Sequence, residues 1–380
     1  MTDIERFKEI SKNKIIHGNC LDEMKKIPDN SVDLIFADPP YWMRVEGALY
    51  RPSGKEFDGC DDHWDNQFNE LEDYETFTRN WLSECRRILA PRGSFWVIGG
   101  MQCIYTIGAI MQEIGFWFIN DVIWHKKNPT PNFMGTRINN AHETLIWAVK
   151  DKKSSYTFNY KTGKELNTDT VSPEEYKKGV RKQLGSVWKI AVCQGDERLK
   201  DENGNKLHST QKPEELLYRI IAISSKLGDF VFDPFGGTMT TAVVAKKMGR
   251  NFLTIEMDQK YCEFGAKRVA NAQVKIGDIE KASFDTRMPR VSMNEMIDAK
   301  YFTVGEKFYF KNTDKFIILE TDNKVIYDGS QTDMHSAAAL VSGRKANRLN
   351  GWEFWYVIRD NKPVSINDIR HKYIKDMGLA

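Results

Sequence analysis

The chain has 380 residues, a formal net charge of +2, 41% hydrophobic residues and 28% charged residues. This balance is typical of a soluble globular protein. It excludes a disordered chain, and it excludes a protein that binds nucleic acid through a uniformly basic surface. We expect a cytoplasmic protein without a membrane partner, since no apolar run is as long as a membrane span. The six cysteines show no C-x-x-C spacing, so the sequence predicts no metal site and no disulfide framework.

Short apolar runs alternate with helical patterns from Ile15 to about Ala270. The runs are SVDLIFAD, GSFWVIGG, FINDVIWHKK, DFVFDPF and NFLTIEMD. This alternation predicts an α/β domain over residues 1–274, with a mostly parallel, doubly wound sheet covered by helices on both faces. Such sheets bind ligands outside the carboxyl ends of their strands.

Two long polar interruptions are predicted to be functional loops, at about 42–72 and 126–209. The second is expected to be irregular, around NPTPNFMGTRINNAHE and VCQGDERLKDENGNKLHSTQKP. Residues 275–296 are predicted to be a linker. Residues 297–380 are predicted to form a small α+β domain, with strands KFYF, FIILE and KVIYDG and helix MHSAAALVSG.

The stretch DLIFADPPYWM places an acid and an aromatic residue at a strand end. Leu34 to Ala37 read as a buried strand, which Pro39 and Pro40 stop because neither can donate a backbone hydrogen bond. A strand ended by proline accounts for the prolines alone. The Asp38 carboxylate and the Pro39 carbonyl could also accept both hydrogens of an exocyclic amine, and Tyr41 could stack on the ring that carries it.

A second strand end lies at DFVFDPFGGTMTT. Gly236 and Gly237 are predicted to form a tight turn before a helix whose free N–H groups can receive an anion. Glu256 ends the next strand, where a carboxylate can accept both hydroxyls of a ribose. Each feature alone is equally consistent with a structural role, but together they outline a nucleoside-cofactor site.

With HSTQKPEELLYRII before the glycine turn, these motifs resemble the amino-type DNA methyltransferases that use S-adenosylmethionine, in the order of their β class. The sequence is similar, nearly end to end, to the GANTC-specific adenine methyltransferases of bacteria. IIHGNCLDEM, DDHWD, WVIGG, CQGDER and NGWEFW carry this closer similarity. The resemblance implies a Rossmann-like methyltransferase fold and methyl transfer to adenine N6 in duplex DNA, by base flipping and direct in-line attack.

By the same resemblance, catalysis is expected at Asp38, Pro39, Pro40 and Tyr41. The cofactor is expected at Asn19, Cys20, Asp38, Thr210, Lys212, Asp233, Phe235, Gly237, Thr240, Thr241 and Glu256. The sequence departs from the family pattern where Met239 replaces a usual glycine and where Asn19 replaces a frequent aspartate. Met239 requires a backbone compatible with a side chain, and it could lower cofactor affinity.

Residues expected to contact DNA are cations, amides and an aromatic: Arg44, Trp64, Lys126, Lys127, Asn132, Arg137, Asn139, Asn140, Lys345, Asn347, Arg348 and Asn350. The C-terminal segment resembles a small methylase-associated domain and is expected to contact the strand opposite the target. Its Trp352, Phe354 and Trp355 are expected to be core residues. We further expect a homodimer, location at the bacterial nucleoid and, in a restriction-modification system, a cognate endonuclease that acts separately.

Other functions remain open at this stage. N4-cytosine methylation uses the same kind of acceptor pair, although such enzymes more often have serine where Asp38 stands. A non-catalytic DNA-binding protein is a further alternative, which Met239 favours slightly, and an RNA or protein-glutamine methyltransferase is another. C5-cytosine methylation is excluded, because its nucleophile is usually in a Pro-Cys pair and the sequence has none.

Overall fold

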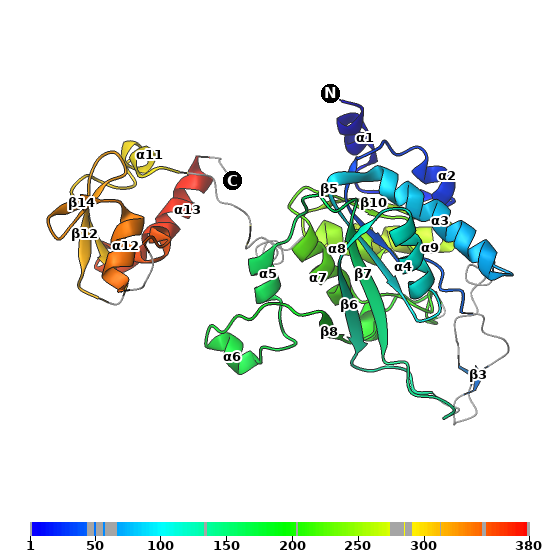
Figure 1. Cartoon of the computed structure of the whole chain (residues 1–380). Coiled ribbons are helices and arrows are strands. Elements are labelled where there is room, and N and C mark those ends of the chain that lie inside the picture. The colour runs from blue at the N-terminus through cyan, green and yellow to red at the C-terminus, as the bar shows by residue number, and fades with distance from the viewer. Residues whose placement is uncertain are drawn as a thin grey trace. The chain divides into compact units, whose positions relative to one another are not determined.

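The structure is a computed structural model of the chain (Figure 1). It describes residues 2–43, 49–50, 56–57, 67–132, 135–202, 204–273, 285, 291–311, 313–343 and 347–377. The chain divides into two compact units, residues 1–286 and 287–380. Within the described ranges, no helix is long and apolar enough to cross a membrane.

An eight-stranded sheet forms the centre of the first unit, in the order β1-β10-β9-β2-β5-β7-β6-β8. Neighbouring strands are parallel except at β7, which runs antiparallel to β5 and to β6. The bounds are β1 (Lys14–His17), β2 (Val32–Ala37), β5 (Leu89–Gly99), β6 (Trp117–Lys126), β7 (His142–Val149), β8 (Val187–Ile190), β9 (Phe230–Asp233) and β10 (Asn251–Glu256).

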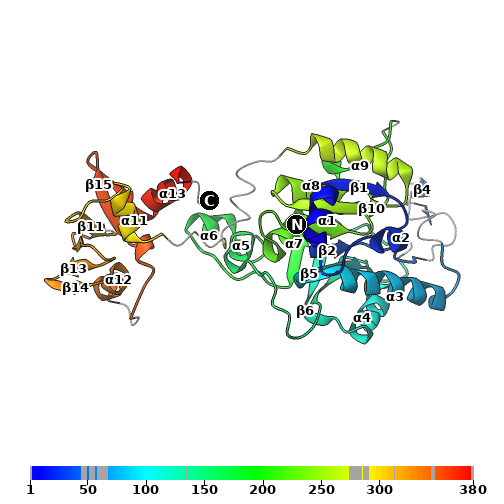
Figure 2. The same ribbon diagram turned by 90° about the horizontal axis from the view of Figure 1, so that it is seen from above.

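Helices cover both faces of this sheet. Along β5, Phe95 and Val97 belong to one buried cluster with residues of α3 and α4, whereas Trp96 and Ile98 belong to a second cluster with residues of α7 and α8. Figure 2 shows α3 and α4 on the opposite side of the sheet from α8. The helices are α1 (Asp3–Ser11), α2 (Cys20–Met24), α3 (Leu71–Ile88), α4 (Ile104–Glu113), α7 (Glu214–Ser224), α8 (Thr240–Lys247) and α9 (Gln259–Asn271). The predicted doubly wound α/β fold is confirmed.

The strand order reverses between β2 and β9, which lie side by side. Leu34 pairs with Val231 and Ile35 with Phe232 in parallel register. From β2 the sheet continues to β5, and from β9 it continues in the other direction to β10 and β1. Adjacent carboxyl ends at such a reversal leave a crevice for a ligand. This geometry brings the two predicted motifs together, because Asp38 follows β2 and Asp233 ends β9.

The second interruption is more regular than the sequence predicts. It contains α5 (Tyr160–Glu165), α6 (Pro173–Lys177), a 3-10 turn at Gly195–Glu197 and strand β8, which pairs parallel with β6 at the edge of the sheet. In β8, Trp188 and Ile190 are buried while the residues before each are exposed. This short alternation of exposed and buried residues is typical of an edge strand, and four residues are too few for the sequence pattern to stand out. The first interruption contains a two-stranded sheet of β3 (Leu49–Tyr50) and β4 (Glu56–Phe57).

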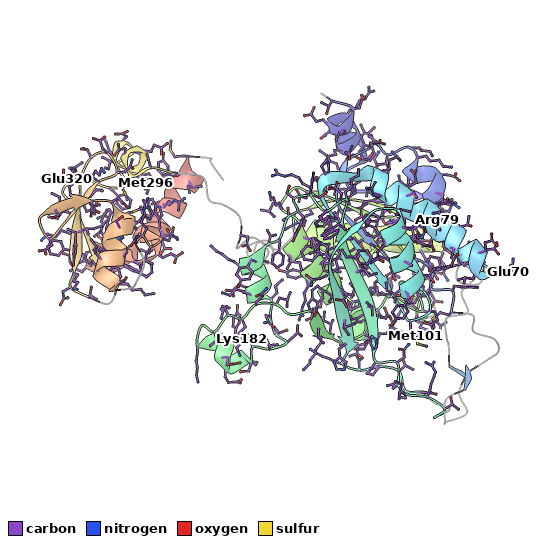
Figure 3. The ribbon with its side chains drawn as sticks, viewed as in Figure 1. Glu70, Arg79, Met101, Lys182, Met296 and Glu320 are labelled. Atoms are coloured by element: carbon purple, nitrogen blue, oxygen red, sulfur yellow. The ribbon has the colours of Figure 1, made fainter. Side chains whose placement is uncertain are left out.

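The second unit contains a six-stranded antiparallel sheet, in the order β14-β13-β12-β11-β15-β16. Val291, Met293 and Met296 lie in its core, so this unit begins inside the predicted linker (Figure 3). Trp352 and Trp355 are buried there, and Phe354 stacks on Phe310. The elements are α11 (Met293–Asp298), β11 (Lys307–Phe310), β12 (Phe316–Leu319), β13 (Val325–Tyr327), β14 (Ser330–Thr332), α12 (Met334–Ser342), a 3-10 turn at Gly351–Glu353, β15 (Trp355–Arg359), β16 (Lys362–Ser365) and α13 (Ile366–Asp376).

Candidate active site

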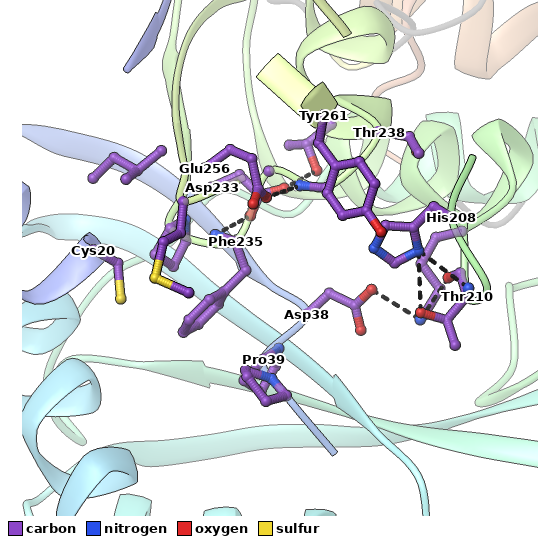
Figure 4. Close-up of a pocket in the computed structure, with 18 of the residues that line it drawn as sticks. Cys20, Asp38, Pro39, His208, Thr210, Asp233, Phe235, Thr238, Glu256 and Tyr261 are labelled. Atoms are coloured by element: carbon purple, nitrogen blue, oxygen red, sulfur yellow. Dashed lines mark hydrogen bonds and ion pairs between the residues drawn. The ribbon is translucent and has the colours of Figure 1, made fainter. Parts of the chain in front are cut away.

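A cavity lies beyond the carboxyl ends of β2, β9 and β10 (Figure 4). The structure brings all the predicted catalytic and cofactor residues to its walls: Asn19, Cys20, Asp38, Pro39, Pro40, Tyr41, Thr210, Lys212, Asp233, Phe235, Gly237, Thr240, Thr241 and Glu256. These residues come from five separate parts of the sequence. Their convergence follows from the parallel register of the central strands.

The turn after β9 is held by hydrogen bonds from its backbone N–H groups to two carboxylates. The Phe235 N–H donates to Asp233 Oδ1 at 2.9 Å, and the Gly237 N–H donates to Glu256 Oε2 at 2.6 Å. Gly237 has a φ of +49°, in the left-handed region that favours glycine. A Cβ on Gly236 would lie 2.5 Å from Thr254 Oγ1, so this position has no room for a side chain. The turn thus approaches β10 closely and leaves open space on the cavity side.

Met239 occupies the place of the usual third glycine. Its backbone is left-handed, with a φ of 61°, at the start of α8. The side chain is 1% exposed and lies in the core against Gly236 and Gly265, and it does not line the cavity. The methionine is therefore accommodated inside the protein, where the missing side chain of Gly265 provides the space.

Several cavity residues also have bonds within the protein. Asn19 Oδ1 caps α2 by accepting the Leu21 N–H at 2.9 Å. The Thr241 hydroxyl donates to Asp233 Oδ2 at 2.5 Å, and the Thr240 hydroxyl donates to the Lys212 carbonyl at 3.3 Å. These side chains fix the cavity wall, so the Asn19 carbonyl and the two hydroxyls are not free groups awaiting a ligand.

The carboxylate of Asp38 is buried at the end of β2. Its Oδ2 forms an ion pair with Lys212 Nζ at 2.8 Å, whereas its Oδ1 has no hydrogen-bond partner among the described residues. Burial raises the pKa of Asp38, and the Lys212 ammonium opposes this rise. A buried acceptor without a donor is costly unless a ligand supplies one. Asp38, at the wall of the cavity, thus provides an unpaired acceptor oxygen for a ligand with a donor group, such as an amine.

Beside it, the prolines and Tyr41 are held in place by neighbours. The Tyr74 hydroxyl donates to the Pro40 carbonyl at 2.9 Å. The Tyr41 hydroxyl donates to Glu143 Oε2 at 2.9 Å, and the Lys212 ammonium lies 5.1 Å from the centre of the Tyr41 ring. Glu143 was not among the predicted site residues. The only sequence signal for it is an acid at the start of the otherwise apolar run TLIWAV.

Trp42 and Met43, which begin the first interruption, lie inside the protein. Trp42 is 4% exposed, stacks on Tyr74 with ring centres 5.6 Å apart and donates its indole N–H to the Phe68 carbonyl at 3.0 Å. Met43 is half-buried and lines the cavity. Trp42 therefore anchors both ends of the loop.

Comparisons with known proteins identify the family of the chain. The family model described as DNA methylase (N6_N4_Mtase) matches residues 32–268. The chain is 46% identical over 361 residues to the type II methyltransferase M.HinfI of Haemophilus influenzae, covering 95% of this chain and 96% of that protein. The chain belongs to the DNA methylase family.

A second relative of this DNA methyltransferase is the type II methyltransferase M2.DpnII of Streptococcus pneumoniae. It is 36% identical over 262 residues, covering 68% of this chain and 91% of that protein. Among solved structures, the cytosine-N4-specific PvuII DNA methyltransferase matches with a TM-score of 0.50 and 19% identity, over 71% of this chain and 90% of that one. This last match concerns the fold.

The methyl donor of the family is S-adenosyl-L-methionine. The cavity fits such a group. Both Glu256 oxygens accept backbone N–H groups, from Gly237 and from Asp258, and each keeps a second lone pair for a ribose hydroxyl. Phe235, Ile255 and Met257 provide apolar walls for a base, and Lys212 provides a cation for a carboxylate.

His208 lies beside the glycine turn, in the segment HSTQKPEELLYRII, and was not predicted as a site residue. Burial lowers its pKa to about 3, and Lys212 contributes to this lowering. Its Nδ1 accepts the Thr210 N–H at 3.1 Å, and its ring packs on Tyr261. The imidazole is therefore neutral and fixes the segment that carries Thr210 and Lys212.

The predicted DNA-contacting residues of the DNA methyltransferase fall into three groups. Arg44, Trp64 and Lys345 lie outside the described residues. Exposed residues are Lys127, Arg137, Asn139, Asn140, Asn347, Arg348 and Asn350, and half-buried Asn132 donates to the Arg137 carbonyl. Lys126 differs from the prediction, since its ammonium points inward to Glu143 Oε1 at 2.7 Å and the side chain is only 18% exposed. The burial follows from the strand pairing, which brings the end of β6 beside the start of β7.

Proposed function

We propose that this DNA methyltransferase transfers the methyl group of S-adenosylmethionine to N6 of adenine in duplex DNA, at the sequence GANTC. The observation that carries the proposal is Asp38 Oδ1, a buried acceptor without a partner among the described residues, next to the glycine turn. A duplex base cannot reach this depth, so the target nucleotide must leave the stack, at a cost of a few kcal/mol.

In this proposal each residue of the site has a separate role. Asp38 Oδ1 and the Pro39 carbonyl accept the two hydrogens of the amine, which turns the nitrogen lone pair toward the methyl donor. Tyr41 stacks on the extruded base, a contact worth about 1–3 kcal/mol. The bound cofactor supplies an electrophilic methyl group on its sulfonium. Lys212 pairs with Asp38 Oδ2, and its ammonium opposes the rise in the pKa of Asp38 that burial causes, which favours the ionised form.

We favour adenine over cytosine as the substrate because of Asp38. The N4-cytosine methyltransferases with a similar motif more often have serine at this position. The fold does not distinguish the two substrates, as it matches a cytosine-N4-specific enzyme. The non-catalytic alternative loses its support, because Met239 is turned away from the cavity.

Recognition of GANTC is inferred from the sequence resemblance and from exposed polar residues. Arg137, Asn139 and Asn140 between β6 and β7 carry side chains suited to phosphates and base edges. The second unit would contact the strand opposite the target. A two-fold-related site suits a homodimer at the bacterial nucleoid, alone or beside a separate endonuclease.

The test is transfer of labelled methyl from S-adenosylmethionine to duplex oligonucleotides with and without GANTC, followed by nucleoside analysis. We expect N6-methyladenine in the GANTC duplex only, and no transfer by Asp38→Ala. Cys262→Ser, at a buried cysteine in α9 outside the cavity lining, serves as the matched control and should retain activity. Labelled N4-methylcytosine, or label in both duplexes alike, would contradict the proposal.

A further inference from the structure

Glu143 is a buried acid on β7 at the side of the catalytic tetrapeptide. It pairs in register with Trp124 of β6, and its side chain is 13% exposed. A carboxylate in such a place is costly unless it is paired and hydrogen-bonded, so its contacts indicate what holds it there.

Three groups from three separate parts of the chain meet this carboxylate. Lys126 Nζ lies 2.7 Å from Oε1, and the Tyr41 hydroxyl donates to Oε2 at 2.9 Å. Lys212 Nζ lies 3.9 Å from the same Oε2. Burial favours protonation of Glu143, but Lys212, Lys126 and the Tyr41 bond outweigh it, and the pKa is lowered. The group is thus a carboxylate at neutral pH and accepts hydrogen bonds without donating one.

Two of these groups also touch the parts of the site that meet the base. Lys212 forms the ion pair with Asp38 at 2.8 Å and donates to the Thr210 carbonyl at 3.2 Å. Tyr41 supplies the stacking ring, and Lys212 lies over the face of that ring at 5.1 Å. Glu143 therefore contacts both the residue that orders the acceptor and the residue that forms the stacking face.

The charges also balance. Two carboxylates, Asp38 and Glu143, and two ammonium groups, Lys126 and Lys212, lie together with little exposure. Without Glu143 the buried site would have an excess positive charge, and Lys212 would be drawn fully to Asp38. A residue buried only for stability would not need to bridge the stacking ring and the cation of the acceptor.

We propose that Glu143 is a positioning residue for methyl transfer, which fixes the Tyr41 ring through its hydroxyl and holds Lys212 between two carboxylates. This inference rests on the proposed transfer at Asp38. Glu143 does not touch the reacting atoms. It sets the angle of the ring on which the base stacks, and it holds Lys212 on Asp38 Oδ2, so that Oδ1 has no donor among the described residues and can accept from the amine.

The experiment compares Glu143→Gln, Tyr41→Phe and the double variant in single-turnover methylation of a GANTC duplex, with saturating cofactor and DNA. We expect Glu143→Gln to slow the step about 10- to 100-fold, the range caused by small misplacements of reacting groups. Cofactor affinity is measured alongside, because Lys212 also faces the cofactor cavity, and saturating cofactor keeps any change in binding out of the measured rate. The loss in the double variant should be smaller than the product of the two single losses, because both changes act on one contact.

A spectroscopic readout separates positioning from stability. With 2-aminopurine in place of the target adenine, stacking on Tyr41 should quench the extruded base in the wild type. Glu143→Gln should give brighter emission at equal DNA occupancy. Asp169→Asn is the matched control, because Asp169 is another buried acid paired with a buried cation, Arg219, outside the cavity. It should lower the melting temperature but leave the methylation rate per folded molecule and the emission unchanged.

A wild-type rate and emission in Glu143→Gln would overturn the inference, as would losses in the double variant that simply multiply. If Glu143→Gln does not fold, Tyr41→Phe tests the same contact without unpairing a buried charge, and unchanged rate and emission in that variant would also overturn it. A wild-type protein that leaves adenine unmethylated would instead refute the proposed function. The two failures are therefore distinguishable.

Discussion

Met239 shows how a single residue can break a motif and still preserve the turn. The left-handed backbone that glycine would adopt without strain is adopted here by a methionine, at a cost of order 1 kcal/mol. Burial of the side chain offsets this cost, because it fills a space between the glycine turn and α9. The substitution is tolerated only because residue 265 is glycine.

This dependence gives a prediction for Gly265→Ala. The new Cβ would lie 2.2 Å from Met239 Cγ, so we expect a loss of about 1–3 kcal/mol in the free energy of unfolding. With Met239→Gly the clash disappears, and Ala in a helix is favoured over Gly by about 1 kcal/mol. The same change should then be neutral or stabilising. Urea unfolding of the two single variants and the double variant measures both effects, and equal losses in both backgrounds would contradict the explanation.

His208 gives a prediction about pH. Its pKa is lowered from 6.5 to about 3 in the folded protein, so below pH 6.5 the unfolded chain binds a proton that the folded chain does not. Stability should therefore fall by about 1.4 kcal/mol per pH unit as the pH drops from 6.5 toward 3. His208→Gln should show a shallower fall. Unfolding midpoints at pH 7.5 and 5.0 test this, and parallel curves for wild type and variant would show that His208 is not responsible.

At the scale of elements, the sequence predicted well those strands and turns that depend on a short local pattern of residues. The strands β2 and β9 and the turns after them follow from apolar runs ended by proline or glycine, and their neighbourhood follows from the parallel sheet. Strand β8 was missed because it is only four residues long and only Trp188 and Ile190 are buried in it. A pattern of two buried residues is too short to detect.

The site was predictable only in part, because some of its residues meet only through contacts between distant parts of the sequence. Asp38 and Glu256 lie at recognisable strand ends, but Glu143 depends on contacts that no local pattern contains. Tyr41 and Glu143 are 102 residues apart in sequence, and Lys126 meets Glu143 only through the pairing of β6 with β7. Lys126 was expected to contact DNA, as a cation at the start of the second polar interruption. Strand register, which the sequence does not specify here, turned its ammonium inward.

At the scale of the whole molecule, the two units have separate cores and separate sheets. The family model ends at residue 268, inside the first unit, whereas the similarity to M.HinfI covers 95% of the chain. The chemistry is thus accounted for without the second unit, and the role of that unit must be argued from its own surface. Its exposed polar residues include Asn347 and Arg348, which follow α12.

We predict that these residues contribute to DNA binding. Arg348 lies 3.1 Å from Asp333 at the start of α12, and its side chain is 65% exposed, so it can reach a phosphate without unburying a core residue. The double substitution Asn347→Ala and Arg348→Ala should weaken binding of a GANTC duplex about 10-fold and reduce the salt dependence by about one phosphate contact. Cofactor affinity should be unchanged, because the cavity is built entirely by the first unit.

The control for this prediction is Lys324→Ala, another exposed cation, in the turn before β13 of the same unit. If the second unit attracts DNA only through its overall positive charge, the control should lose as much affinity as the double variant. If Asn347 and Arg348 make a specific contact, only the double variant should lose affinity. DNA affinity measured by fluorescence anisotropy at several salt concentrations distinguishes the two, because a lost phosphate contact changes the slope of log affinity against log salt. An unchanged slope with unchanged site choice would mean that this surface of the second unit does not bind DNA.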